Sequence, residues 1–263
     1  MLVNKIQIGD HFILASTEQE SVREWIRLHF KVIEPEQWDM TVPDMYIHLK
    51  LGYGEPFESF DVRIRQDGEL IRYARTDFLL ETIGTYREAR LQAHDEVALK
   101  HGLMAFYSAF IVHHGWGLLI HSSCVVSNGK AYLFAGPSGA GKSTVASLSH
   151  PREVLSDEAT LIKIEPDRAL AYDSPFRSDS LSDYGKTARR LDGIHLLEQS
   201  HEIDRLAIPS SEAMLRLMDK IFYWAHDPRD TIKVLAMCRT LAKQVSAYRL
   251  KFQKNDLFWE RIS

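Results

Sequence analysis

A glycine-rich segment near the middle of the chain carries the clearest chemical signal. Residues 136–143 read Gly-Pro-Ser-Gly-Ala-Gly-Lys-Ser, the full phosphate-binding pattern G-x-x-x-x-G-K-[ST]. Glycines let successive backbone N–H groups turn toward phosphate oxygens, and a following helix adds positive potential. Lys142 is expected to reach the β- and γ-phosphates of a nucleotide, and Ser143 to hold Mg²⁺. The predicted nucleotide-binding residues are Gly136, Pro137, Ser138, Gly139, Ala140, Gly141, Lys142, Ser143 and Thr144.

Two adjacent carboxylates, Asp157 and Glu158, follow the loop closely in a short apolar segment. Phosphoryl transfer depends on charge neutralisation and positioning, and a kinase must also accept the proton of the acceptor hydroxyl. Neighbouring carboxylates at one site need a cation between them. The pair is therefore a candidate site for a bound cation. A solvated acidic turn is the alternative.

The segments around the loop predict how it is held. Residues 131–135 form a short apolar run, typical of a buried strand, and the residues after Lys142 can start a helix. Residues 118–126 predict another strand, joined to the first through Asn128-Gly129, the strongest short hairpin signal. The strand entering the loop therefore has an antiparallel neighbour, which parallel-sheet nucleotidases reach through a crossover helix. A second predicted hairpin follows Glu158 and turns at residues 166–167.

The rest of the chain reads as scaffold. Residues 1–85 are rich in strand signals, with a hairpin at residues 66–68. Apolar residues spaced i, i+3, i+4 and i+7 predict a helix over 94–113, which ends before Gly115. Two further amphipathic helices are predicted after Pro209 and Asp227, each with a suitable first turn.

The ordered set of motifs resembles a known family. His121 in a strand, then NGK, GPSGAGKST, LSDE and a hairpin ending in Ser-Pro-Phe resemble the catalytic domain of HPr kinase/phosphorylase. They look still more like the smaller HPr-kinase-like proteins found beside peptide-modification genes, including the lasso-peptide kinases. The likeness covers residues 115–263, through a strand-like segment near 194–199 and an alternating, aromatic C-terminus at 247–259. Glu158 stands where HPr kinases usually have a second Asp, and the N-terminal region differs from theirs.

The resemblance implies roles for individual residues. Asp157 matches the catalytic base, and Glu158 would hold Mg²⁺ together with Ser143. His121 matches the active-site histidine on the neighbouring strand, although a structural histidine is the competing reading. The polar segment 176–190 is long for a connector, and its Arg177 is the first candidate to bind phosphate bidentately. A plain solvated loop is the alternative there.

These observations predict an α/β protein in two parts: a small β-rich domain over 1–92 and, over 93–263, a mixed-sheet P-loop kinase domain of the HPr kinase and phosphoenolpyruvate carboxykinase type. The predicted activity is ATP- and Mg²⁺-dependent phosphorylation of a serine hydroxyl on a peptide or small protein, with a lasso-type precursor peptide as the sharpest expectation. A small-molecule kinase on the same scaffold and a non-catalytic nucleotide-binding regulator are the alternatives.

Composition limits the partners. The chain has 263 residues, 45% of them hydrophobic and 26% charged, as in ordinary soluble globular proteins. A net charge of −4 does not favour nucleic acid or an anionic membrane. No apolar run is long enough to span a bilayer, and the N-terminus lacks the architecture of a signal peptide. Cys124 and Cys238 read as buried thiols, so a cytoplasmic protein is expected, and a homo-oligomer is left open.

Overall fold

The computed structural model describes residues 1–38, 42–178 and 187–262. The chain divides into two compact units. The first comprises Met1–His114 and Tyr223–His226, and the second comprises Gly115–Phe222 and Asp227–Ser263. The sequence placed the boundary at 92/93, before the long helix, whereas the units divide after it. The reason is that this helix packs on strands of the first unit.

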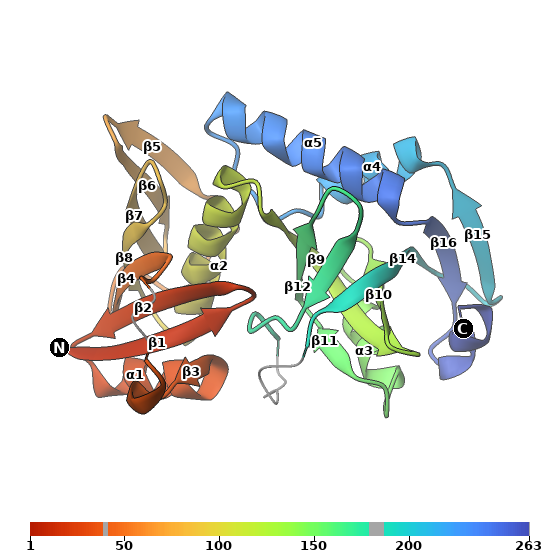
Figure 1. The fold of residues 1–263 in the computed structure, drawn as a ribbon, viewed down its shortest axis with the longest axis horizontal. Helices are drawn as coiled ribbons and strands as arrows, with labels where there is room; N and C mark the ends of the chain where they lie inside the picture. The colour runs from red at the N-terminus through yellow and green to blue at the C-terminus, as the bar shows by residue number, and fades with distance from the viewer. Residues whose placement is uncertain (39–41, 179–186, 263) are drawn as a thin grey trace. The chain divides into compact units, whose positions relative to one another are not determined.

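The first unit is built on an eight-stranded mixed sheet with the order β3-β1-β2-β4-β8-β7-β6-β5 (Figure 1). The hairpin predicted at residues 66–68 is confirmed, because β5 and β6 pair antiparallel around it. The elements are β1 Leu2–Ile8, β2 His11–Thr17, α1 Glu20–His29, β3 Lys31–Ile33, η1 Pro35–Gln37, β4 Met45–Leu51, β5 Arg63–Asp67, β6 Leu70–Arg75, β7 Phe78–Ile83, β8 Glu88–Ala93 and α2 Glu96–His113.

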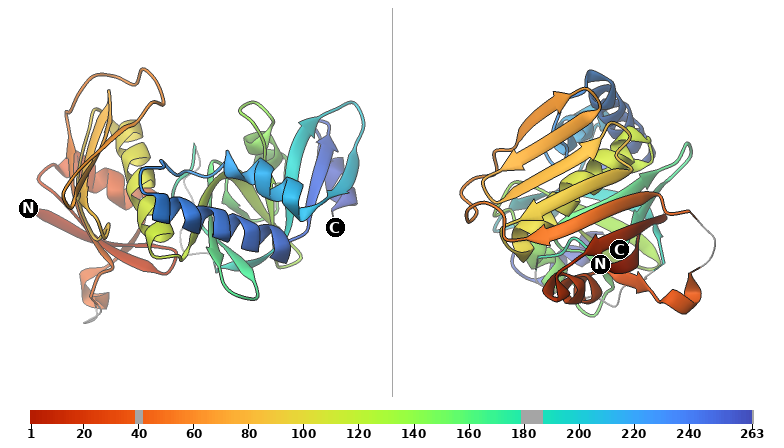
Figure 2. Two further views of the ribbon diagram at one scale, coloured as in Figure 1. Left: turned by 90° about the horizontal axis from the view of Figure 1, so that it is seen from above. Right: turned by 90° about the vertical axis from the view of Figure 1, so that its left-hand side faces the viewer.

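The helices α1 and α2 cover one face of this sheet (Figure 2). Alternate residues of the strands point toward them, as in β4, where Met45, Ile47 and Leu49 are buried between exposed or half-exposed neighbours. The helix predicted over 94–113 is confirmed as α2, whose N-terminus is capped by the Asp95 carboxylate accepting from Ala98 N–H. The other face of the sheet is not covered by either helix.

The second unit contains a five-stranded barrel. Its strands pair in the order β10-β9-β12-β13-β14, and the ring closes because β10 also pairs with β14 in parallel. β16 extends the sheet from β14, β15 lies beyond β16, and β11 pairs with β9. The elements are β9 Gly117–Ser127, β10 Lys130–Ala135, α3 Lys142–Leu148, β11 Val154–Ser156, β12 Ala159–Ile164, β13 Ala169–Tyr172, β14 Arg189–Gln199, β15 Asp204–Ile208, α4 Ser210–Met218, α5 Pro228–Gln244, β16 Ala247–Phe252 and η2 Asp256–Arg261.

Local expectations for this unit are confirmed. Asn128 and Gly129, both with positive φ, form the tight turn between the antiparallel strands β9 and β10. β12 and β13 form the second hairpin, and α5 begins at Pro228 after an Asp227 cap. The chain is thus a mixed α/β protein, as expected. Cys124 and Cys238 are buried, and neither forms a disulfide. In the part of the chain that is described, no helix is long and apolar enough to cross a membrane.

Candidate functional site

The glycine-rich loop runs from the end of β10 to the start of α3, and its glycines are sterically required. Gly139 and Gly141 have φ values of 76° and 104°, which L side chains rarely adopt. A Cβ on Gly136 would lie 2.7 Å from the Cβ of Ala140, and one on Gly141 would lie 2.6 Å from the Phe252 ring. The pattern therefore reflects backbone conformation and close packing together.

Lys142 is held inside the loop. Its side chain is buried, with the residue 8% exposed, and Nζ donates to the carbonyl oxygens of Gly136 at 3.1 Å and Pro137 at 3.0 Å. Burial and the charge of Lys220 lower the pKa of the Lys142 amine. Ser143 and Thr144 follow in the first turn of α3, where Ser143 is exposed.

Two strands anchor the loop. From β9, Ser123 Oγ donates to the carbonyl oxygen of Lys142 at 2.8 Å. From β14, Gln199 Nε2 donates to the carbonyl oxygen of Gly139 at 2.8 Å. Because β9 and β14 are the two neighbours of β10, the loop is fixed on both sides of the strand that feeds it.

The acidic pair lies between β11 and β12, next to β9. The N–H of Ser122 donates to the carbonyl oxygen of Glu158 at 3.1 Å, and Ala159 pairs with His121. The Asp157 carboxylate accepts hydrogen bonds from Ser178, from N–H at 3.1 Å and from Oγ at 2.7 Å. The structure thus brings the pair to the strand that carries His121 and contacts the loop through Ser123.

His121 is a half-buried, neutral histidine. Burial lowers its pKa to about 4, with further lowering from the charges of Lys142 and Lys220. Its ring lies 5.5 Å from that of Phe222, measured between centroids. The predicted residues His121 and Lys142 are therefore close enough to influence each other electrostatically.

Arg177, which is expected from the sequence to bind phosphate, makes structural contacts within the protein. Its Nε donates to the Ser174 carbonyl, and its Nη2 donates to the carbonyls of Val154 and Leu155 at 3.1 and 3.0 Å and to Asp173 Oδ1 at 2.6 Å. The residue is only 7% exposed. Its guanidinium thus ties β11 to the segment after β13. Residues 179–186 of the connector, including Lys186, lie outside the described residues.

One part of the site had no sequence signal. Residues 220–222 pair with β9: Ile221 bridges to Ile120, and the His121 N–H donates to the Lys220 carbonyl at 2.6 Å. This contact links segments about 100 residues apart, so no local sequence pattern predicts it.

The described residues contain no group of three or more His, Cys, Asp or Glu side chains arranged to hold a metal ion. Any Mg²⁺ here would take most of its ligands from phosphates and water, as is usual for this ion. Ser143 and Glu158 are the side chains that the sequence offers for the remainder.

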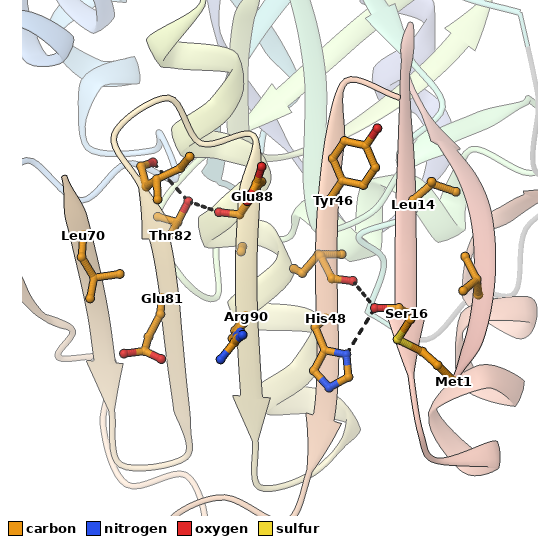
Figure 3. Close-up of a pocket in the computed structure, with 14 residues that line it drawn as sticks. Met1, Leu14, Ser16, Tyr46, His48, Leu70, Glu81, Thr82, Glu88 and Arg90 are labelled. Carbon is orange, nitrogen blue, oxygen red and sulfur yellow. Dashed lines mark hydrogen bonds between the residues drawn. The ribbon is translucent and has the colours of Figure 1, made fainter. Parts of the chain in front are cut away.

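A second concave surface lies on the uncovered face of the first unit's sheet. It encloses about 540 Å³ and is lined by side chains from six strands (Figure 3). Ser16 and His48 are hydrogen-bonded at 3.2 Å, and Thr82 Oγ1 donates to the Glu88 carbonyl at 2.8 Å. The remaining lining is apolar or of mixed charge, including Glu81 and Arg90. Ser16 Oγ also lies 3.4 Å from the Ile47 carbonyl oxygen, to which it donates.

Comparison with known proteins gives one family. A search of curated proteins found no match. The family model described as SynChlorMet cassette protein ScmC matches residues 89–263, which begins at β8 and takes in all of the second unit's strands. Because the match covers more than half of the chain, this protein belongs to the family of the SynChlorMet cassette protein ScmC.

Proposed function

We propose that the second unit is a P-loop kinase domain of the HPr kinase type, which transfers the γ-phosphate of ATP to a serine hydroxyl of a peptide or small protein. The observation that carries the proposal is the loop itself. Gly139 and Gly141 adopt conformations suited to an anion cradle, Lys142 is buried within it, and Ser123 ties it to the strand of His121.

The residues fit a Mg-polyphosphate. Gly136 and Gly141 pack against Ala140 and Phe252, whereas nothing lies within 4 Å of a Cβ placed on Gly139, so the backbone there is open to phosphate oxygens. The Lys142 amine, now donating to two loop carbonyls, can exchange them for charged phosphate oxygens, which are stronger acceptors. Ser143 and Glu158 would hold Mg²⁺, which would neutralise charge on the phosphates during transfer.

Asp157 has the contact expected of a base. Its carboxylate accepts a hydrogen bond from a serine hydroxyl, that of Ser178, at 2.7 Å. A substrate serine that replaced Ser178 would present its proton in the same way. As the new bond from the acceptor oxygen to phosphorus forms, the bond from phosphorus to the β–γ bridging oxygen breaks, and the acceptor proton passes to Asp157.

The same observation favours a second candidate. Asp157 also accepts from the Ser178 N–H, so the carboxylate serves as a local cap for this segment. If that is its whole role, the protein binds nucleotide without transferring phosphate and acts as a regulator. Whether Asp157 is needed for transfer therefore separates the two functions.

The experiment uses the full chain with γ-labelled ATP and Mg²⁺. Acceptors are peptides encoded beside this protein's gene, small alcohols, or nothing, and label is followed by mass spectrometry. We expect phosphoserine on a peptide and none with Lys142→Ala. Label transfer to small alcohols only would replace the peptide kinase by a small-molecule kinase. Nucleotide binding without any transfer of phosphate would support the nucleotide-binding regulator. Absence of nucleotide binding would contradict both the kinase and the regulator.

A further inference from the structure

Lys220 lies beside the phosphate loop through an unpredicted strand pairing. After α4, the chain runs antiparallel to β9, with Ile221 opposite Ile120. The His121 N–H donates to the Lys220 carbonyl at 2.6 Å, and the Phe222 N–H donates to the Leu119 carbonyl at 2.9 Å. These two hydrogen bonds fix the register of the pairing.

The register places the Lys220 side chain on the face of β9 that carries the loop. Residues opposite each other in an antiparallel pair point to the same face, so Lys220 shares a face with His121. Ser123, two residues further along β9, lies on that face too, and it donates to the Lys142 carbonyl at 2.8 Å. The rings of His121 and Phe222 lie 5.5 Å apart, consistent with both residues lying on that face.

The Lys220 ammonium is partly withdrawn from solvent. Its side chain is 14% exposed and pairs at 2.5 Å with Asp219, whose own side chain is 66% exposed. The charge of Lys220 lowers the pKa of both His121 and Lys142, which means that positive charge is concentrated on this face. Two cations held close together repel, and an anion placed between them removes that cost.

We propose that Lys220 is a second cation of the nucleotide site and contacts the γ-phosphate of ATP. The γ-phosphate is the expected contact because Lys220 lies opposite His121. His121 in turn pairs with Ala159, directly after the acidic pair at which transfer would occur. Lys220 thus has the phosphate-binding role that the sequence predicted for Arg177. The inference rests on the proposed function, since it needs ATP in the loop.

The test compares binding of Mg-ATP and Mg-ADP by calorimetry. Lys220→Met should weaken ATP binding roughly tenfold to a hundredfold, the worth of one charged hydrogen bond, while ADP affinity changes less than about threefold. Lys220→Arg keeps the charge and should restore most of the ATP affinity. Lys130→Met is the matched control, because Lys130 also pairs with an aspartate, Asp192 at 3.1 Å, but lies at the opposite end of β10 from the loop.

The outcomes separate this inference from the proposed function. Equal loss of ATP and ADP binding in Lys220→Met, or no loss of either, overturns the role of Lys220 while leaving the loop as the nucleotide site. Lys142→Ala should weaken both nucleotides, and if the wild-type protein binds neither, the proposed function and this inference fail together. A lower melting temperature in Lys220→Met with unchanged selectivity would make Lys220 a structural residue only.

Discussion

The packing of Gly141 gives a quantitative test of how the loop is built. Gly139 and Gly141 both have positive φ, so alanine at either position adopts a conformation that costs about 1–2 kcal/mol. The reduced freedom of the unfolded chain returns part of this, about 0.4–1 kcal/mol. Gly139→Ala, with nothing within 4 Å of the new Cβ, should therefore destabilise the protein by about 1 kcal/mol.

Gly141→Ala carries an additional steric cost. Its Cβ would lie 2.6 Å from Phe252 Cζ, well inside van der Waals contact. Phe252 is only 2% exposed and packs edge-to-face on Phe258, so its ring cannot swing away freely. Overpacking of this kind costs about 1–3 kcal/mol, which brings the total for Gly141→Ala to about 2–4 kcal/mol.

The assay is urea unfolding of the full chain, followed by circular dichroism, with Mg-ATP binding measured in parallel. Gly141→Ala should lose more stability than Gly139→Ala by at least about 1 kcal/mol. In the Gly141→Ala background, Phe252→Leu removes Cζ, so the double variant should be more stable than the sum of the single losses by about 1 kcal/mol or more. Equal losses for the two alanine variants, or strict additivity with Phe252→Leu, would refute the packing argument.

Four more predictions concern single side chains. His195 is fully buried and its pKa is lowered to about 3, so below pH 6.5 the unfolded state takes up a proton that the folded state does not. Stability should fall as pH drops, by about 2 kcal/mol between pH 6.5 and 5, and His195→Phe should lack this component in urea titrations. Arg177→Met leaves the Asp173 charge buried and should cost about 3–5 kcal/mol of unfolding free energy without changing the ATP affinity of the folded protein. Asp157→Asn should bind ATP nearly normally but phosphorylate peptide at least about a hundredfold more slowly, as seen by mass spectrometry. Glu158→Gln should raise the Mg²⁺ concentration for half-maximal rate more than it changes metal-free ATP binding.

Each of these has a contrary result. Identical pH dependence in His195→Phe would mean that the buried ring does not titrate differently on unfolding. A loss of less than about 0.5 kcal/mol in Arg177→Met is what an exposed loop arginine would give. Full activity in Asp157→Asn removes it as the base, whereas lost ATP binding moves it to the metal site. An unchanged Mg²⁺ titration makes Glu158 a surface acid.

Structural features that are determined by a few adjacent residues were predictable from the sequence. Asn128-Gly129 dictates a tight turn because both residues adopt positive φ, and the strands on either side follow from it. The loop glycines likewise indicate positive φ values, which Gly139 and Gly141 adopt. The apolar spacing over 94–113 and the Gly115 that follows predicted the helix α2. In all these cases the deciding signal lies within one turn, hairpin or helix.

Features decided by distant contacts were not predictable. The barrel closes through the parallel pairing of β10 with β14, whose residues are about 60 positions apart, and either strand alone is compatible with an open sheet. Arg177 looked like a loop cation because its neighbours are polar. Its burial depends on carbonyl oxygens of Val154 and Leu155 that become its acceptors only after β11 has formed. The position of Lys220 depends on a pairing with β9 in the same way.

Electrostatics explains why we assign phosphate binding to Lys220 and not to Arg177. A buried guanidinium needs hydrogen-bond acceptors, and Arg177 directs its Nε and Nη2 donors to backbone carbonyls and Asp173, so these donors are not open to a ligand. Lys220 shares a face of β9 with the neutral ring of His121, the charges of Lys142 and Lys220 both reach that ring, and the acidic partner of Lys220 faces solvent. The two amines repel each other, and a further anion between them would reduce that repulsion. A polyphosphate held by the loop amides would balance these charges, as the proposed function requires, whereas a neutral ligand would leave both amines under mutual repulsion.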